Sequence, residues 1–70
     1  MRTQKEIGMI IQSARVKKGY TQEQFGEMLD CGKDAGSTVR KWENGKYYPS
    51  ITKIREIARI LGLTLDDLVP

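Results

Sequence analysis

The sequence predicts an all-α protein, a compact single domain of five short helices that spans residues 1–70. Apolar residues recur at intervals of three and four, and no useful length shows the strict alternation that is typical of a β-strand. Several of these segments follow Ser or Thr and end at Gly, the residues that begin and end helices. Because 70 residues lie near the lower size limit for independent folding, we expect nearly every large apolar residue inside.

Thr3 and Glu6 form the pattern of a capping box, which opens a first helix at about Gln4–Lys18. Gly19 is the expected stop, because glycine readily adopts the left-handed conformation that ends many helices. The buried face of this helix is expected to contain three apolar residues at helical spacing, Ile7, Ile11 and Ala14.

Residues 21–45 predict two helices joined by a turn. Thr21 and Gln24 repeat the capping-box pattern, and Gly45 is placed to end the second helix. Gly26, in the middle of the first of these helices, costs about 1 kcal/mol relative to Ala, which favours a close approach of the second helix. The inward faces are expected to comprise five large apolar residues, Phe25, Met28, Leu29, Val39 and Trp42.

The rest of the chain predicts a loop and two more helical segments. Pro49 disfavours helix before it, Ser50 caps a helix at about Ile51–Leu61, and Gly62 ends that helix. Its inward stripe is expected to consist of four residues, Ile54, Ile57, Ala58 and Leu61. After Thr64, a last short helical turn is expected to close the base of the core with two leucines, Leu65 and Leu68.

Composition excludes several classes of function. The chain has no His and a single Cys, Cys31, so neither a zinc site, an internal disulfide nor a nucleophile–base pair is expected. Cys31 is expected to pack as a small hydrophobe beneath the turn. No apolar run approaches ~20 residues, and the N-terminal segment lacks the pattern of a signal peptide. We therefore expect a cytoplasmic protein that is not an enzyme, with no cofactor, metal, membrane or small-molecule substrate.

The net charge of +3 is modest, but basic residues gather in the second half of the chain. Between positions 33 and 59 there are seven of them, Lys33, Arg40, Lys41, Lys46, Lys53, Arg55 and Arg59. The same window holds three acidic residues, Asp34, Glu43 and Glu56. Two interpretations of this charge are equally supported. The residues form either a solvated surface of mixed sign or a surface that binds a polyanion.

The ordered set of motifs resembles the Cro/CI-type (XRE-like) helix-turn-helix regulators of bacteria and their phages. The matching segments run from about Ile7 to Leu68 and are IGMIIQSAR, KGYTQEQFG, STVRKWENGKYYPS and ITKIREIARILGLTLDDL. The resemblance implies a lambda-repressor-like domain of five helices that binds double-stranded operator DNA as a homodimer. Its second helix would cross the DNA backbone, and its third would enter the major groove.

The resemblance also implies roles for particular residues. Gln22 matches a phosphate-binding residue of the family. It lies at a helix start, where backbone N–H groups without intrahelical partners attract anions. The alternative is a surface glutamine with no role in binding. Asn44 and Lys46 match a loop that grips the next phosphate, although a helix cap and a solvated lysine explain them too. Lys33, in the preceding turn, is placed with these phosphate-binding residues.

On the third helix, four outward residues are the candidates for base readout, Ser37, Thr38, Arg40 and Lys41. Arg and Lys bind guanine O6 and N7, but the same two side chains can contact phosphates alone. Arg15 and Glu43 match a partly buried structural salt bridge between the first and third helices, and a surface Arg15 that keeps its charge in water is the alternative.

The chain departs from the pattern at the turn. Nine residues separate Leu29 from Val39, about three more than a short helix-turn-helix turn requires. Ala35 and Gly36 stand where the family prefers long polar side chains. A second function is therefore considered, that of a modulator or antirepressor that binds a partner repressor protein. For that function, Tyr47 and Tyr48 are candidate anchors, whereas packing over Trp42 is the alternative and is favoured for one of the two.

Overall fold

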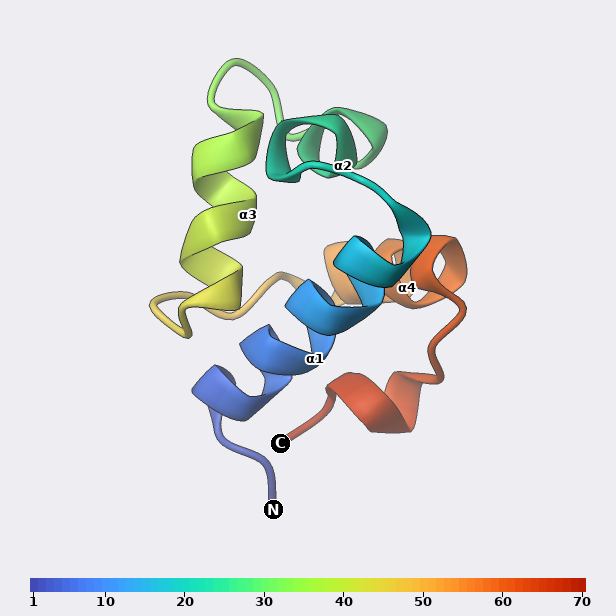
Figure 1. The fold of residues 1–70 in the computed structure, drawn as a ribbon. Coiled ribbons are helices and arrows are strands. Elements are labelled where there is room, and N and C mark those ends of the chain that lie inside the picture. Colours follow the sequence, from blue (N-terminus) through green and yellow to red (C-terminus); the bar gives the residue numbers. More distant parts are fainter.

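The computed structural model describes all 70 residues and consists of helices and loops only. Its elements are four α-helices and one short 3-10 helix: α1 (Gln4–Lys18), α2 (Gln22–Met28), α3 (Ala35–Glu43), α4 (Ile51–Leu61) and η1 (Leu65–Leu68) (Figure 1). The expected all-α class and the four main helices are confirmed. The expectation of five helices is wrong, because the segment after Thr64 is only four residues long and closes as a 3-10 turn.

The helix boundaries follow from side-chain caps and glycines. Thr3, Thr21 and Ser50 each accept a hydrogen bond from a backbone N–H at the start of the helix that follows. Gly19 and Gly62 end α1 and α4 in the left-handed conformation, with φ angles of 83° and 70°. These groups satisfy backbone atoms that helix ends leave without intrahelical partners.

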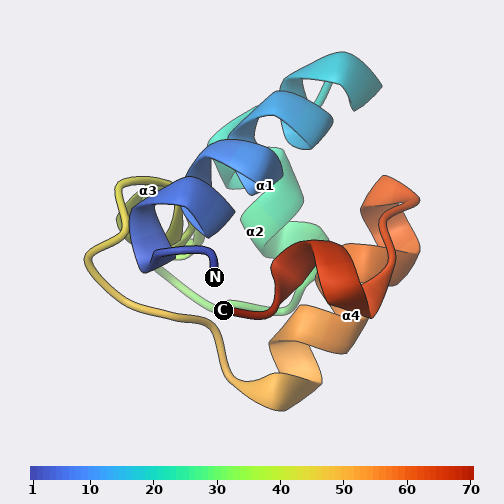
Figure 2. The same ribbon diagram turned by 90° about the horizontal axis from the view of Figure 1, so that it is seen from below.

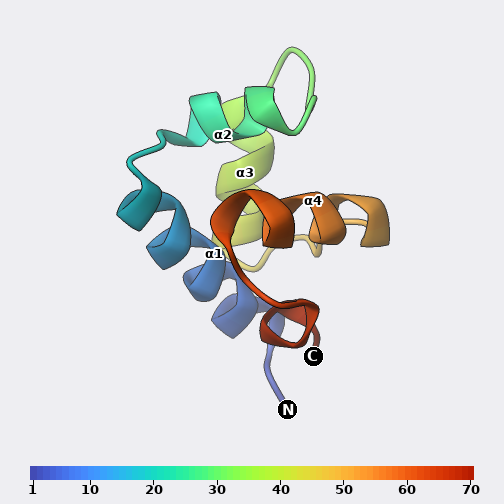
Figure 3. The ribbon, with the colours of Figure 1, turned by 90° about the vertical axis from the view of Figure 1, so that its right-hand side faces the viewer.

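α3 forms one side of the molecule and α4 the other, with α1 and α2 between them (Figure 1, Figure 2). α3 packs against α2 and α1, whereas η1 packs against α1 and α4. The two chain ends lie close together beneath this arrangement (Figure 3). The core between the helices is built from eleven buried residues, Ile7, Ile11, Phe25, Leu29, Val39, Trp42, Ile54, Ile57, Ala58, Leu61 and Leu68.

Three of the expected core positions are corrected. Met28 and Leu65 are each 45% exposed, and Ala14 is only half-buried at the edge of the core. In α1 and α2 the buried arc is rotated toward α3, so that it includes Gly8 in α1 and Gly26 in α2. At 3.6 residues per turn, this rotation moves Ala14 and Met28 to the rim.

Candidate nucleic-acid interface

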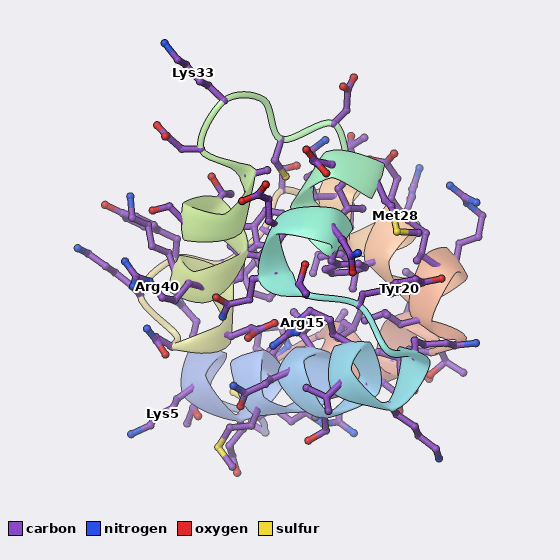
Figure 4. All side chains as sticks on the ribbon, turned by 45° about the horizontal axis from the view of Figure 1, so that its top comes forward. Lys5, Arg15, Tyr20, Met28, Lys33 and Arg40 are labelled. Atoms are coloured by element: carbon purple, nitrogen blue, oxygen red, sulfur yellow. The ribbon has the colours of Figure 1, made fainter.

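The turn between α2 and α3 is long. It comprises residues 29–34, whereas a short helix-turn-helix turn needs ~3–4 residues. Asp30 and Gly32 adopt left-handed backbone conformations with φ angles of 59° and 82°. Lys33 lies at the tip, and its side chain points away from the protein (Figure 4). Cys31 is half-buried against the core, as a small hydrophobe would be.

Gly26 explains how α2 and α3 meet. A Cβ atom at this position would lie 2.5 Å from the backbone oxygen of Ala35 and 2.7 Å from its Cβ. No side chain fits into this space. The close approach that the glycine predicted is confirmed, and it places the first turn of α3 directly against α2.

The outward face of α3 carries the four candidates for base readout. Arg40 is exposed and points away from the core (Figure 4), while Ser37, Thr38 and Lys41 are half-buried. Gly36 lies beside α2, where an added Cβ would be 3.4 Å from Cα of Glu23. The polar face of α3 therefore depends on these four side chains, with no side chain at position 36.

A buried network connects the end of α3 to α1 and α2. Glu43 Oε2 lies 2.6 Å from Arg15 Nε, and Glu43 Oε1 accepts from Arg15 Nη2 at 3.1 Å. The same Oε1 accepts from Gln22 Nε2 at 3.0 Å. Arg15 and Glu43 are 7% and 5% exposed, so the pair is buried and Arg15 is not a surface arginine. Glu43 thereby holds the amide of Gln22 at the start of α2.

After α3, the loop at residues 44–48 contains both exposed and packed side chains. Asn44 and Lys46 are exposed. The ammonium groups of Lys41 and Lys46 each lie 5.8 Å from the ring centre of Tyr47, which is 54% exposed. Tyr48 instead packs against the core, and its hydroxyl donates to the backbone oxygen of Leu68. One tyrosine of the pair is therefore structural, and the other is available at the surface.

The basic residues of positions 33–59 do not form one surface. Lys53 donates to the backbone oxygen of Leu29 and pairs with Glu56, so it supports the end of α2. Arg55 and Arg59 are exposed on α4, on the other side of the molecule from α3. The basic residues that remain near α3 are Lys33, Arg40, Lys41 and Lys46.

Acidic residues gather at the first turn of α3. Glu23, Glu27 and Asp34 line a shallow hollow of about 270 Å³ beside this turn, and Lys33 is the one basic residue that also lines it. The carboxylate of Asp34 makes no capping hydrogen bond. Negative charge at a helix N-terminus complements the helix dipole, which is the structural explanation for these residues.

Titratable groups elsewhere have structural roles. Burial raises the pKa of the Cys31 thiol, which therefore stays protonated, unlike a catalytic thiolate. Hydrogen bonds from Thr3 and Thr64 lower the pKa values of the Glu6 and Asp67 carboxyl groups in their capping boxes. No three His, Cys, Asp or Glu side chains come together as a metal site would require. None of the helices has the length and apolarity of a membrane span.

Comparisons with known proteins fit this geometry. The family model described as helix-turn-helix matches residues 11–68. The chain is 36% identical over 64 residues to the HTH-type transcriptional activator BcrR of Enterococcus faecalis, and this match covers 91% of the chain and 30% of that protein. It is 35% identical over 63 residues to the uncharacterized HTH-type transcriptional regulator YazB of Bacillus subtilis (strain 168), covering 90% and 87%.

A third relative is an enzyme. The chain is 33% identical over 54 residues to the type II methyltransferase M1.ScrFI of Lactococcus lactis subsp. cremoris. This match covers 77% of the chain but 14% of the methyltransferase, so it identifies a shared segment and brings no catalytic centre with it. No solved structure matches the chain significantly.

Proposed function

The chain belongs to the XRE-like helix-turn-helix family, and from this premise we propose that it binds operator DNA as a transcriptional regulator of the Cro/CI type. In this proposal α3 enters the major groove and α2 crosses the DNA backbone. Repression is the simplest effect, because a protein bound across a promoter excludes other proteins without any further contact.

The observation that carries the proposal is the arrangement around α3. Its outward face is polar, with Arg40 exposed at the centre. Gln22 is fixed beside this face by its bond to Glu43, and Asn44 follows the last turn. A helix of this kind, flanked on both sides by groups that bind phosphate, can be held in a groove while its side chains reach base edges.

Individual roles follow from this arrangement. We assign base readout to the four outward residues of α3, Ser37, Thr38, Arg40 and Lys41. We assign phosphate binding to four residues around it, Gln22, Asn44, Lys46 and Lys33. We further propose that the 70 residues act as one domain and as a homodimer in a prokaryotic cytoplasm. The dimer would bind half-sites about one helical turn apart.

A salt titration of binding to random-sequence duplex DNA tests the proposal, with fluorescence anisotropy as the readout. Each phosphate contact contributes about −0.9 to the slope of log K against log salt. We expect a slope that corresponds to four or more contacts. Arg59→Ala, on α4, is the control for a change in net charge and should leave the slope as it is. A slope near zero would contradict the proposal.

A second candidate function has its own support. The carboxylates beside the first turn of α3 would repel phosphates, and the exposed ring of Tyr47 is suited to a protein interface. These features favour a modulator or antirepressor that binds a partner repressor. Little DNA binding even at low salt would support it. The next measurement is then the release of a purified XRE-type repressor from its labelled operator when this chain is added.

A further inference from the structure

We propose that the first turn of α1 belongs to the DNA interface, with the ammonium group of Lys5 binding a backbone phosphate next to the one assigned to Asn44 and Lys46. The inference rests on the proposed function and extends it to a helix outside the helix-turn-helix. Nothing in the spacing of the sequence points to Lys5, which is 41 positions from Lys46 in the chain.

The loop after α3 lies directly on the first turn of α1. Gly45 has a φ angle of 77°, and a Cβ atom there would lie 2.7 Å from Cα of Lys5 and 2.9 Å from its backbone nitrogen. The side-chain amide of Gln4 donates to the backbone oxygen of Gly45 at 3.3 Å. The backbone of Lys5 is therefore placed beside the loop that we assign to a phosphate.

A second glycine contact fixes α1 against α3. A Cβ atom at Gly8 would lie 2.4 Å from the backbone oxygen of Glu43 and 2.5 Å from that of Trp42. The α1 backbone thus rests on the last carbonyl groups of α3. Because both Gly8 and Gly45 make backbone contacts, Lys5 cannot move away from the end of α3 without a change in the fold.

The cations at this corner, Lys5, Lys41 and Lys46, have no carboxylate partner in the protein. The two salt bridges of the protein are Arg15–Glu43 and Lys53–Glu56, and neither includes Lys5, Lys41 or Lys46. Lys41 and Lys46 both lie over the ring of Tyr47. Unpaired like charges gathered on one surface raise the local concentration of anions, and a DNA backbone supplies anions at regular spacing.

The direction of the side chains supports the same surface. Lys5 and Arg40 project from the same side of the molecule, although they belong to α1 and α3 (Figure 4). Arg40 is one of the residues that we assign to the major groove. A phosphate that borders the groove near the end of α3 would therefore lie within the region that Lys5 faces.

α1 also offers a matched control. Lys17 is exposed on the same helix but lies about 18 Å from Lys5 along the helix axis, at 1.5 Å per residue. It belongs to the last turn of α1, where basic side chains complement the helix dipole. Lys17→Ala and Lys5→Ala therefore remove the same charge from the same helix at opposite ends.

The experiment compares the two variants with the full chain in the salt titration on random-sequence duplex DNA. We expect Lys5→Ala to reduce the steepness of log K against log salt by about 0.9 and to weaken binding roughly eightfold at 100 mM salt. Lys17→Ala should match the full chain, and Lys5→Arg should restore the slope. Thermal unfolding of each variant verifies the fold.

The outcomes separate this inference from the proposed function. If the full chain binds with a steep slope and Lys5→Ala behaves as Lys17→Ala does, the inference is wrong while DNA binding stands. If the full chain does not bind DNA, the proposed function fails first, and this inference fails with it. If Lys5→Ala loses its slope and Lys5→Arg does not regain it, the loss is not one of charge, and the phosphate contact is overturned.

Discussion

The two ends of α3 are held in different ways. At its C-terminal end, Glu43 is bound by Arg15 of α1 and Gln22 of α2, so three helices meet at one buried carboxylate. At its N-terminal end, α3 contacts α2 through the gap that Gly26 leaves. The residues before that end form a long turn with Lys33 at its tip.

The charge near the two ends also differs. Lys41 and Lys46, which have no carboxylate partner, lie near the C-terminal end, whereas three carboxylates and one lysine line the hollow at the N-terminal end, Glu23, Glu27, Asp34 and Lys33. The lysines near the C-terminal end attract phosphates, whereas the carboxylates near the N-terminal end repel them and leave Lys33 as the one residue there that we assign to a phosphate. A helix that enters a groove under these conditions is anchored more strongly by its C-terminal half than by its first turn, where Ser37 and Thr38 are assigned to base readout.

The largest effect is expected at the buried network. Arg15→Ala leaves the Glu43 carboxylate buried without its partner, which should cost about 3–5 kcal/mol of unfolding free energy. Chemical denaturation measures this loss. The exposed Lys17→Ala on the same helix is the control and should stay within about 0.5 kcal/mol of the full chain. A loss below 1 kcal/mol for Arg15→Ala would mean that water reaches Glu43 and that the C-terminal end is not locked.

The double variant Arg15→Met/Glu43→Leu refines this measurement. Replacement of both charges by apolar side chains of similar size is often neutral or stabilising, because it removes the cost of burying the ions. We expect it to recover most of the stability that Arg15→Ala loses. It should nevertheless bind DNA more weakly than the full chain does, because Gln22 loses the carboxylate that orients its amide.

The next largest loss of stability is expected at the two glycine contacts, which can be compared directly. Gly8→Ala and Gly26→Ala each place a Cβ atom within 2.5 Å of a backbone oxygen of α3, one at each end of the helix. Each should cost roughly 1–3 kcal/mol through overpacking. Gly36→Ala is the control, because its Cβ finds a contact at 3.4 Å and an alanine favours a helix. If Gly26→Ala leaves the stability unchanged while Gly8→Ala lowers it, the long turn allows the N-terminal end of α3 to shift away from α2.

Arg40 and Lys41 test how α3 uses its outward face. Arg40→Ala and Lys41→Ala should each weaken DNA binding by roughly tenfold without lowering thermal stability, because Arg40 is exposed and points away from the core and Lys41 is half-buried and outside the core cluster. A weaker preference for a selected operator would identify base readout. A shallower salt slope with unchanged preference would identify a phosphate contact. Unchanged binding by both variants would remove α3 from the interface.

The sequence predicts the local features of this fold well. The caps at Thr3, Thr21 and Ser50 each depend on a few residues that are neighbours in the chain. The sequence alone is therefore enough to predict them. Gly26 also predicted a helix contact, because a glycine inside a helix has a cost that packing must offset. Periodicity alone did not place Met28, since the rotation of α2 is set by which side meets α3. That side depends on residues far along the chain.

The candidate site is less accessible to sequence reasoning. The seven basic residues between positions 33 and 59 left a polyanion-binding surface and a solvated surface of mixed sign equally open. The fold decides between them, because it places Lys53 at the core edge and Arg59 on α4, on the other side of the molecule from α3. Lys5 joins the site only because Gly45 folds back on α1. The acidic surroundings of α3 arise similarly, because Glu27 and Asp34 meet only when the turn closes. Such groupings require three-dimensional contacts.

The smallest expected effect lies at these carboxylates. A unit charge about 10 Å from a phosphate contributes ~0.4 kcal/mol of repulsion in water, so each neutralisation should strengthen DNA binding roughly twofold at low salt. Asp34→Asn is the cleanest change, because Asp34 makes no side-chain capping bond and Asn is an equally good N-cap. Asp66→Asn on η1, which packs against α1 and α4, is the control. A combined Glu27→Gln/Asp34→Asn variant should gain about the sum of the single free energies and lose that gain as salt screens the charges. If neutralisation instead weakens binding, these carboxylates accept hydrogen bonds from cytosine amino groups, and the acidic end of α3 contributes to specificity.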